Sequence, residues 1–367
     1  MTKSISLIIV HYHTPDLLFN MLNSFSAHYH EVREYSFEFI IVNNGGDPDI
    51  VKSITLPGPV HIISPEGNSG YAGGINLGVL HSSGDILFLM NADLIFHSQS
   101  LVSLLKSLEE ADIAGPQFYW ESRCQIYLPP TEPYSFIYNL MKILSDSDEF
   151  FLHILQKLWR KYTYRHILTS KAIESYQLSG AMLGIRRSCW LEVGPFDEQF
   201  KLYFEEVDWL LRSRKQGFRA VFQPKSKVTH LYNQSSKKER LSRHWFEKSS
   251  HYFAIKHHHG VSRKITGWIQ KNIGRNSHAD INCWERIRKS KFDHFEPLPL
   301  SQLQLEPGDT YFLEISVFKS FVPSAIFVID DTFQASDWIL PNEVWKNLEP
   351  GAYYFRIVDS NGWKLLP

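Results

Sequence analysis

The chain has 367 residues, of which 43% are hydrophobic, so it can bury a large core as two domains or as one domain with an appendage. Its formal net charge is −1, and no nucleic-acid partner is expected. The near-neutral total hides a basic segment, residues 237–291, with 14 Lys and Arg against 4 Asp and Glu, and an acidic one, residues 292–367, with 4 against 11. The basic segment suits contact with anionic lipid or phosphate.

Three widely spaced cysteines form no CxxC pair, which argues against a disulfide framework or a zinc ribbon and favours a reducing, cytoplasmic compartment. The N-terminal apolar run Ser4–Val10 stops at His11, too short for a signal peptide or a membrane span. No other window approaches about eighteen consecutive apolar residues, so any membrane contact is expected to be peripheral, on the inner face of the cytoplasmic membrane.

Strands and helices alternate in the first half of the chain. A helix-start signal, Thr14-Pro15-Asp16, follows the first strand, and a second helix follows the Gly-rich segment Asn68–Gly74. The alternation predicts an α/β fold with a mostly parallel sheet, whose strand-end loops converge on one crevice. The expected strands are Ile5–Val10, Phe37–Val42, Val60–Ser64 and Ile86–Met90.

Three of these loops carry residues suited to a nucleotide. After the first strand, His11–Thr14 offers a ring to stack on a base and N–H groups for a phosphate, although Thr14 could simply cap the next helix. After the second, Asn43 and Asn44 could bond a base edge, although an Asn-Gly turn needs no ligand. The glycines of Gly70–Gly74 would let the backbone approach a ribose or diphosphate, but a Gly-rich loop alone is weak evidence.

The fourth strand runs into the turn Asn91-Ala92-Asp93. One carboxylate and one amide oxygen at a strand end can hold Mg²⁺ or Mn²⁺ while leaving positions for diphosphate oxygens. An Asx turn is the plain alternative. His230 ends another expected strand, Phe222–His230, and is either a structural histidine or a third metal ligand.

Glu205, Glu206 and Asp208 lie within four residues of one another. If this segment opens a helix, Glu205 and Asp208 share a face and Glu206 projects elsewhere, into the crevice in the functional interpretation. The alternative is a charged, solvated first turn favoured by the helix dipole.

Other nucleotide and hydrolase signatures are missing from the sequence. The first strand is followed by His-Tyr-His and not by the glycines of a dinucleotide fingerprint, and there is neither a P-loop nor a nucleophile elbow. Dehydrogenase, kinase and serine-hydrolase functions are therefore disfavoured.

Taken together in order, several motifs resemble those of family 2 glycosyltransferases, and most closely the rhamnosyltransferase-like and galactofuranosyltransferase-like bacterial members. The resemblance covers roughly the first 260 residues. The motifs are Leu7–Pro15, Asn68–Gly78, Asn91-Ala92-Asp93, Gly194-Pro195-Phe196-Asp197, Phe204–Asp208 and His230.

The resemblance implies a GT-A fold and a metal-assisted, inverting reaction. Asp93 would bind Mn²⁺ or Mg²⁺, Asn91 would be a weaker or outer partner, and His230 falls on a family metal ligand. Glu206 matches the position of a general base that is usually an aspartate, with Glu205 as the less favoured candidate, and Asp208 would orient the loop or contact the acceptor. Nucleotide-sugar binding would fall to His11, His13, Asn43, Asn44, Gly70, Tyr71, Gly73, Asn76, Asn91 and Asp93.

The implied reaction moves a sugar from a nucleotide-diphosphate sugar donor to a hydroxyl of a glycan or polyprenyl-linked acceptor, in bacterial surface polysaccharide synthesis such as lipopolysaccharide or capsule. Asn43 stands where relatives commonly carry an aspartate that accepts from the uracil or thymine N–H, so the base stays open. UDP or dTDP sugars are favoured, with GDP sugars retained. The alternatives are a sugar nucleotidyltransferase, disfavoured by the N-terminal loop, and a glycan-binding protein that kept the fold without turnover.

The remaining sequence suggests three parts, residues 1–236 as the catalytic domain, 237–292 as a basic helical extension and 293–367 as an acidic β-rich module. Two aromatic and basic segments, 149–171 and 241–273, either rest on a membrane surface or pack against the catalytic domain, and His257–His259 is expected to be a polar helix end. Trp338, Trp345 and Trp363 either form core or make the module a carbohydrate-binding or oligomerisation appendage.

Overall fold

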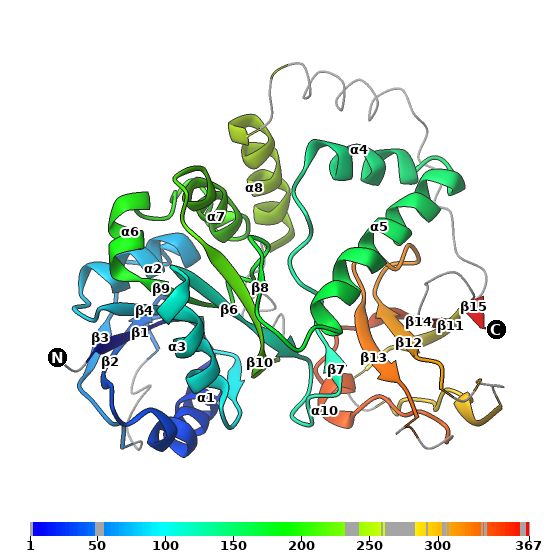
Figure 1. The fold of residues 1–367 in the computed structure, drawn as a ribbon, viewed down its shortest axis with the longest axis horizontal. Coiled ribbons are helices and arrows are strands. Elements are labelled where there is room, and N and C mark those ends of the chain that lie inside the picture. The colour runs from blue at the N-terminus through cyan, green and yellow to red at the C-terminus, as the bar shows by residue number, and fades with distance from the viewer. Residues whose placement is uncertain are drawn as a thin grey trace. The chain divides into compact units, whose positions relative to one another are not determined.

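The computed structural model describes residues 3–47, 55–231, 242–257, 260, 283–290, 293–302, 306, 308–331, 333, 336–359 and 365–366. The chain divides into two compact units (Figure 1). Unit 1 consists of Met1–Phe118 and Thr169–His258, and unit 2 of Tyr119–Leu168 and His259–Pro367.

The sheet of unit 1 begins with four parallel strands in the order β3-β2-β1-β4, which confirms the four predicted strands. Continuous Ile, Leu, Val and Phe runs form the inner strands because helices cover both faces of such a sheet. The strand bounds are β1 (Ser4–His11), β2 (Ser36–Asn43), β3 (Val60–Ile63) and β4 (Ile86–Asn91). Beyond β4 the sheet turns antiparallel, with β9 (Met182–Arg186) and then β6 (Ile113–Tyr119).

The helices of unit 1 pack through apolar stripes. Helix α1 has Pro15 in its first turn and buries Leu18, Met21, Leu22 and Phe25, as the sequence pattern predicts. Thr14 does not cap this helix with its side chain; its hydroxyl contacts the His11 ring instead, at 3.2 Å. The bounds are α1 (Pro15–His28), α2 (Gly70–Leu80), α3 (Ser100–Glu110), α6 (Arg187–Val193), α7 (Glu205–Lys215) and α8 (Ser242–His257), with a 3-10 turn at Tyr29–Val32.

A long strand, β10 (Ala220–His230), joins distant parts of unit 1. It pairs with β6, with β5 (Leu94–Phe96) and with β8 (Ile173–Glu174). The β5 ladder is antiparallel and sets His230 opposite Leu94. This register brings the end of β10 to the segment that follows β4.

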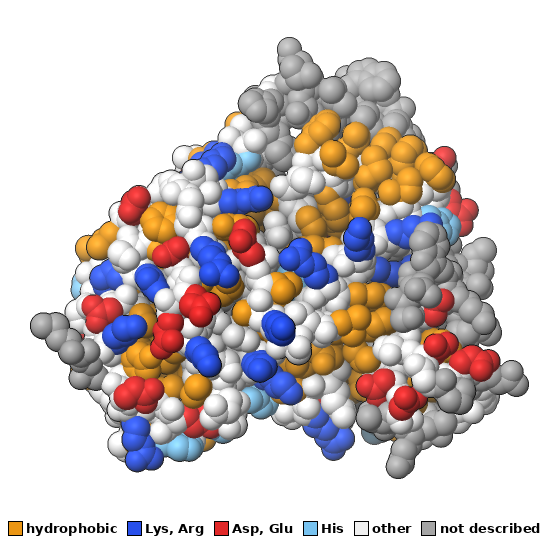
Figure 2. Space-filling view, viewed as in Figure 1, with side chains coloured by type: hydrophobic (Ala, Val, Ile, Leu, Met, Phe, Trp, Pro, Cys, Tyr) orange, Lys and Arg blue, Asp and Glu red, His pale blue; other side chains and the backbone are white. Residues whose placement is uncertain are grey.

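Unit 2 contains an antiparallel sheet, in the order β11-β14-β12-β13-β7, and the helices α4, α5 and α10. Hydrophobic side chains gather over helix α4 (Figure 2). The elements are β7 (Ile126–Tyr127), α4 (Phe136–Ser145), α5 (Glu149–Ile167), β11 (Trp284–Arg288), β12 (Tyr311–Ser316), β13 (Ala325–Ile329), α10 (Asn342–Trp345), β14 (Gly351–Asp359) and β15 (Leu365–Leu366), with a 3-10 turn at Leu300–Gln302.

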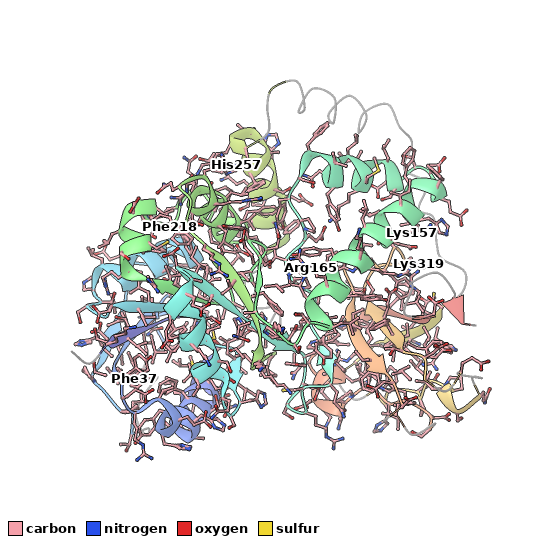
Figure 3. All side chains as sticks on the ribbon, viewed as in Figure 1. Phe37, Lys157, Arg165, Phe218, His257 and Lys319 are labelled. Carbon is pink, nitrogen blue, oxygen red and sulfur yellow. The ribbon has the colours of Figure 1, made fainter. Side chains whose placement is uncertain are left out.

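Helix α5 is bound to this sheet by aromatic stacking and by buried charge. The rings of Tyr164 and Phe312 stack at 4.0 Å. The carboxylate of Glu314, on β12, accepts from Arg160 on α5 at 2.8 Å and from Arg356 on β14 at 2.6 Å. Burial would raise the pKa of Glu314, but the two guanidinium groups lower it to about 2. Lys157 and Arg165 stand on the same helix (Figure 3).

These units differ from the predicted three-part division. Residues 119–168, expected in the catalytic domain, fold with the C-terminal strands, because α5 supplies one partner of the buried Glu314 charge. Within the basic segment 237–292, helix α8 belongs to unit 1, and residues 261–282 lie outside the described part. In the described part of the chain, no helix has both the length and the apolar character that crossing a membrane requires.

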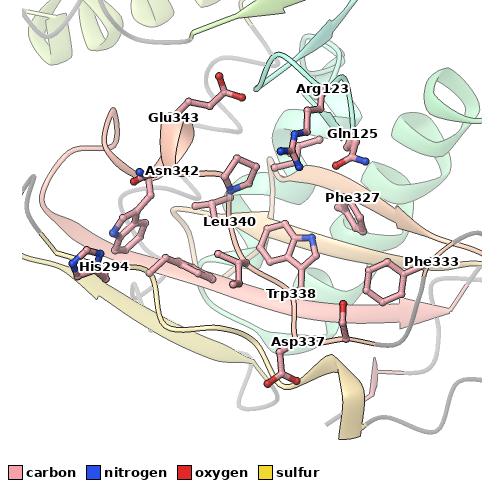
Figure 4. Close-up of a pocket in the computed structure, with 16 residues that line it drawn as sticks. Arg123, Gln125, His294, Phe327, Phe333, Asp337, Trp338, Leu340, Asn342 and Glu343 are labelled. Carbon is pink, nitrogen blue, oxygen red and sulfur yellow. The ribbon is translucent and has the colours of Figure 1, made fainter.

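The aromatic residues of unit 2 mostly serve its core. Trp338 and Trp345 are buried and surround Phe295, while Trp363 lies outside the described residues. Of the two roles that the sequence left open for these tryptophans, Trp338 and Trp345 thus form part of the core. Trp338 also lines a pocket of about 660 Å³, together with polar residues such as Arg123 and Gln125 (Figure 4).

Glu314→Gln is expected to destabilise the folded chain by about 3–5 kcal/mol at neutral pH, because two guanidinium groups stay buried without their carboxylate. Since the pKa of Glu314 is depressed from 4.5 to about 2, this contribution is present above pH 4.5 and lost as the pH falls toward 2. Thermal melts of wild type and variant from neutral pH downward should therefore converge. The exposed Glu306→Gln is the control, and a pH-independent gap would contradict the assignment.

Candidate functional site

Asp93 and His230 lie together in unit 1. The Nε2 atom of His230 is 3.4 Å from Oδ1 of Asp93, and Asp93 is only 3% exposed. The backbone fixes the pair, since His230 stands opposite Leu94 in the β5–β10 ladder and the Leu231 N–H donates to the Asp93 carbonyl at 3.0 Å. Two side chains far apart in the sequence are thus held by one strand pairing.

The donor types of this pair suit a divalent cation. A carboxylate and an imidazole, with the amide of Asn91 at the last position of β4, are ligands that Mn²⁺ accepts. Among the described residues, no group of three or more His, Cys, Asp and Glu side chains is placed to hold a metal. A site with few protein ligands still fits Mg²⁺ or Mn²⁺, because these ions commonly complete their coordination with phosphates and water.

A second group of acids opens helix α7. Tyr203 and Phe204, just before it, both have positive φ, at 69° and 72°, a strained conformation for large side chains. The resulting sharp turn directs the first helical residues inward, and Glu205 is buried. The expectation of a solvated first turn is therefore wrong, because these carboxylates face the interior.

Burial changes the proton affinity of both glutamates. It raises the pKa of Glu206, against hydrogen bonds from backbone N–H groups that include that of Gly180. Burial and the charge of Glu206 raise the pKa of Glu205 well above its ordinary value. One oxygen of each carboxyl, Oε2, is enclosed and has no hydrogen-bond partner within the described chain. Such oxygens are able to take a proton from a bound group.

Tyr71 connects the two groups of acids. Its hydroxyl donates to the Gly180 carbonyl at 2.6 Å. Burial raises the pKa of Tyr71 well above its usual value, and the carboxylates of Glu205, Glu206 and Asp93 add to the rise. The four side chains are therefore close enough to interact electrostatically.

Gly180, which the sequence indicated only as one of a run of small residues, gives Glu206 its place. A Cβ at position 180 would lie 3.1 Å from Cβ and Cγ of Glu206, closer than carbon atoms normally approach. Ser179-Gly180-Ala181, directly before β9, was the available signal.

Asp208 serves a different purpose from its neighbours. It is fully buried, and its carboxylate accepts from Arg212 at 2.9 Å and from His257 at 2.7 Å, with Lys256 at 2.8 Å. Burial would raise its pKa, but the bonds from His257 and Lys256 and the charge of Arg212 lower it to about 2. Lys256 also binds Asp197 at 2.6 Å. The acids of two sequence motifs thus bind the end of α8, where His257 lies (Figure 3).

The loops after β1 and β2 form a cluster around Asp47, which the sequence analysis missed. Its carboxylate contacts His11 Nε2 at 2.9 Å and His13 Nδ1 at 3.0 Å. Both ends of the Asn43 amide bond the Asp47 backbone, and the contact of Asn43 with a base stays a prediction. Asn44 holds the Gly70 carbonyl at 2.9 Å. The Gly-Gly-Asp turn was the only signal for Asp47.

The glycines and Asn76 of helix α2 allow close packing. Gly70 has φ 77°, and a Cβ there would lie 2.4 Å from the Lys201 carbonyl oxygen; at Gly73 it would lie 3.1 Å from Ser69 Cβ. The Asn76 amide bonds both the N–H and the carbonyl of Phe196. These contacts hold α2 against the loop around Phe196 and Lys201, and the approach of the glycines to a ribose stays a prediction.

Comparison with known proteins gives a consistent picture. The model of the family described as Glycosyl transferase family 2 matches residues 6–189, half of the chain. Over 118 residues the chain is 33% identical to N-acetylglucosaminyl-diphospho-decaprenol L-rhamnosyltransferase of Mycobacterium tuberculosis, covering 31% of this chain and 37% of that protein. Over 223 residues it is 21% identical to the low-salt glycan biosynthesis hexosyltransferase Agl10 of Haloferax volcanii, covering 59% and 64%.

The chain thus spans less than two thirds of the length of either relative. Among solved structures, a mannosyltransferase from Pyrobaculum calidifontis in complex with GDP-Man and Mn²⁺ aligns with a TM-score of 0.48 and 12% identity, over 74% of this chain and 73% of that chain.

Asp208→Asn is expected to loosen the end of α8, because Lys256, His257 and Arg212 lose a charged acceptor that is worth roughly 2–4 kcal/mol when buried. Hydrogen exchange of residues 248–257 should accelerate by tenfold or more, while that of β1 and β4 stays unchanged. Glu192→Asn, an exposed acid on α6, provides the comparison. Unaltered exchange in α8 would show that the network does not hold the helix.

Proposed function

The chain belongs to glycosyl transferase family 2, and from this premise we propose that it moves a sugar from a nucleotide-diphosphate sugar to a hydroxyl of a glycan or polyprenyl-linked acceptor, with inversion at the anomeric carbon. The observation that carries the proposal is the arrangement around Gly180 and Ala181. The Tyr71 hydroxyl donates to the Gly180 carbonyl, and the Glu206 side chain packs against Gly180. The Asn91 N–H, two residues before the Asp93 that lies beside His230, donates to the Ala181 carbonyl at 2.9 Å. The mixed α/β sheet of unit 1, a GT-A fold, presents these residues after its central strands.

Asp93 and His230, with Asn91 as a weaker partner, would hold Mn²⁺ or Mg²⁺. When bound, the cation supplies positive charge to the departing diphosphate. The chain contributes rigidity, since Asp93 and His230 are fixed by the β5–β10 ladder. A donor held at this edge of the sheet keeps its anomeric carbon in one place, which lowers the entropic part of the barrier.

Glu206 is the proposed general base. Its carboxylate would take the proton of the acceptor hydroxyl while that oxygen attacks the anomeric carbon in line with the departing nucleotide. Burial raises the pKa of Glu206, which makes its ionised form a stronger base. Glu205 is the less suitable base, because its burial keeps it from the acceptor, and burial with the charge of Glu206 raises its own pKa well above the ordinary value.

Asp208 is a positioning residue in this scheme. Its oxygens bind Arg212, Lys256 and His257, and its depressed pKa makes it a poor base at neutral pH. It would act by holding α8 against α7, and thereby the turn that carries Glu206.

Asp47 is the proposed contact for the nucleobase. A carboxylate accepts from the ring N–H of uracil or thymine, and Asp47 stands at the ends of β1 and β2 with two histidines that orient it. His13, partly exposed, could stack on the base. This arrangement favours a UDP or dTDP sugar over a GDP sugar. Asn43 shapes the turn.

The acceptor class follows from the relatives. One of them is named for a lipid diphosphate acceptor and the other for glycan biosynthesis, so we propose a lipid-linked or glycan acceptor in surface polysaccharide synthesis. The competing function is a protein of the same fold that binds nucleotide or glycan without turnover. The enclosed, raised-pKa carboxyl of Glu206 favours catalysis, because a binding protein has no need of such a base.

Glu206→Gln is expected to lower kcat by about 10²–10⁴-fold, because the base is lost, while donor binding persists. In the wild type, the raised pKa of Glu206 predicts that activity falls on the acid side with an apparent pKa above 4.5. The rate of product formation from labelled UDP and dTDP sugars, recorded at a series of pH values, measures the fall in kcat of the variant and the acid-side loss of activity of the wild type. The control is the exposed Glu192→Gln, and equal turnover in wild type and Glu206→Gln would favour the binding-only function.

Nucleotide binding is expected to depend on the cation through Asp93 and His230. UDP, dTDP and GDP are each added with and without Mn²⁺, and at about 100 times Kd the matching nucleotide should stabilise the fold by about 2.7 kcal/mol, read as a higher melting temperature. Asp93→Ala and His230→Ala should abolish the Mn²⁺-dependent part, and the exposed Asp16→Ala should keep it. If each nucleotide stabilises the fold equally with and without Mn²⁺, the proposed cation site at Asp93 and His230 is contradicted.

A further inference from the structure

Helix α4 of unit 2 has an apolar face that the rest of the described chain leaves open. Its sequence, Phe136-Ile-Tyr-Asn-Leu-Met-Lys-Ile-Leu-Ser145, is largely apolar, yet within its ten residues only Tyr138 and Ser145 are buried. Ile137 is 66% exposed. Folding leaves such a surface in water only at a cost of free energy, so large apolar patches commonly mark contact surfaces.

Further exposed apolar side chains stand on α5 and in the β12–β13 turn of the same unit. Phe150 and Leu158 of α5 are 66% and 41% exposed. In the turn between β12 and β13, Val317 and Phe318 are each 51% exposed, and this turn contacts α5 through a bond from Gln156 Nε2 to the Ser320 carbonyl at 3.0 Å. We call Ile137, Phe150, Leu158, Val317 and Phe318 the apolar surface. Figure 2 shows hydrophobic side chains gathered over α4.

Cations accompany the apolar surface. Lys157, Lys161 and Arg165 are exposed and four residues apart on α5, so they form one stripe. Lys319 follows Phe318 in the β12–β13 turn (Figure 3). Arg160 and Tyr164 of α5 contact the sheet, through Glu314 and Phe312 of β12.

The acids near this surface gather where α4 meets α5. Asp146 and Asp148 stand in the turn between the two helices and Glu149 opens α5, and the Asp148 side chain caps α5 at 2.8 Å from the Phe150 nitrogen. Glu132 is paired with Lys142 at 2.7 Å. The stripe on α5 therefore stays positively charged along its length.

We propose that the apolar surface and the α5 stripe bind an anionic lipid bilayer, with α4 lying in the plane of the membrane interface. Exposed Phe, Ile and Leu beside Lys and Arg are the pattern of interfacial helices, whose cations meet anionic headgroups while their apolar side chains enter the acyl boundary. At about 1.5 Å per residue, α4 is far too short to span a bilayer.

The inference rests on the proposed function, because a lipid-linked acceptor is reached at a membrane surface. It adds the surface of the chain that makes contact and assigns it to unit 2, whereas the residues proposed for catalysis belong to unit 1.

Co-sedimentation of the full chain with vesicles tests the proposal. Binding is expected to vesicles of phosphatidylcholine and phosphatidylglycerol in equal parts, to weaken with added salt, and to be much weaker to phosphatidylcholine alone. Ile137→Ser with Phe150→Ser should weaken binding about tenfold or more. Lys157→Gln, Lys161→Gln and Arg165→Gln together should weaken it about a hundredfold at low salt.

The matched control is Leu80→Ser with Leu191→Ser, two leucines of unit 1 that are 78% and 70% exposed, and it should bind like wild type. Circular dichroism melts verify that each variant is folded. Absence of binding to the anionic vesicles, or equal binding by wild type and the Ile137/Phe150 variant, would overturn the proposal. So would self-association that depends on Ile137 and Phe150 without any vesicle binding.

Failure of this inference can be told apart from failure of the proposed function. Transfer to a short, water-soluble acceptor analogue needs no membrane, so the Ile137/Phe150 variant should keep it while losing transfer to a vesicle-embedded acceptor. If neither acceptor is glycosylated but the chain binds vesicles, the proposed reaction is contradicted and the proposed membrane-binding surface is supported.

Discussion

The antiparallel pairing of β5 with β10 is the constraint on which the candidate site depends. It fixes the His230 imidazole beside the Asp93 carboxylate although the two residues are 137 positions apart in the sequence. A slip of one residue in this ladder would turn the His230 side chain to the other face of the strand. The pairing therefore sets which side-chain donor atoms lie together after the end of β4.

The acids of α7 show how neighbouring carboxylates acquire different chemistry. Glu205 is buried and Glu206 is half-buried, neither forms an ion pair within the described chain, and their pKa values rise. Asp208, two residues further, meets Lys256, His257 and Arg212, and its pKa falls to about 2. The decisive difference is the opposite charge that Lys256 of α8 and Arg212 of α7 supply to Asp208.

The sequence predicted the α/β order and the four parallel strands. A continuous apolar run such as Ile86–Met90 is typical of a strand that helices cover on both faces of a parallel sheet. The sequence also selected Asp93, His230 and Glu206, since ordered motifs at strand and helix ends carry chemistry. Asp47 and Gly180 escaped notice because a turn aspartate and a small residue look ordinary until the contacts of His11 and Glu206 are known. Likewise, nothing local to residues 119–168 reveals that Arg160 meets Glu314, a partner 154 positions away.

That distant partnership has a consequence for how the chain can be divided. Unit 2 is assembled from two segments, and the chain passes between the units three times, near residues 118, 168 and 258. Removing the segment after residue 292 would leave the Arg160 guanidinium and the ring of Tyr164 facing solvent in place of β12. The unit can therefore be exchanged or inherited only as a pair of segments, and an evolutionary insertion of 119–168 without its C-terminal counterpart would have had no sheet to fold upon.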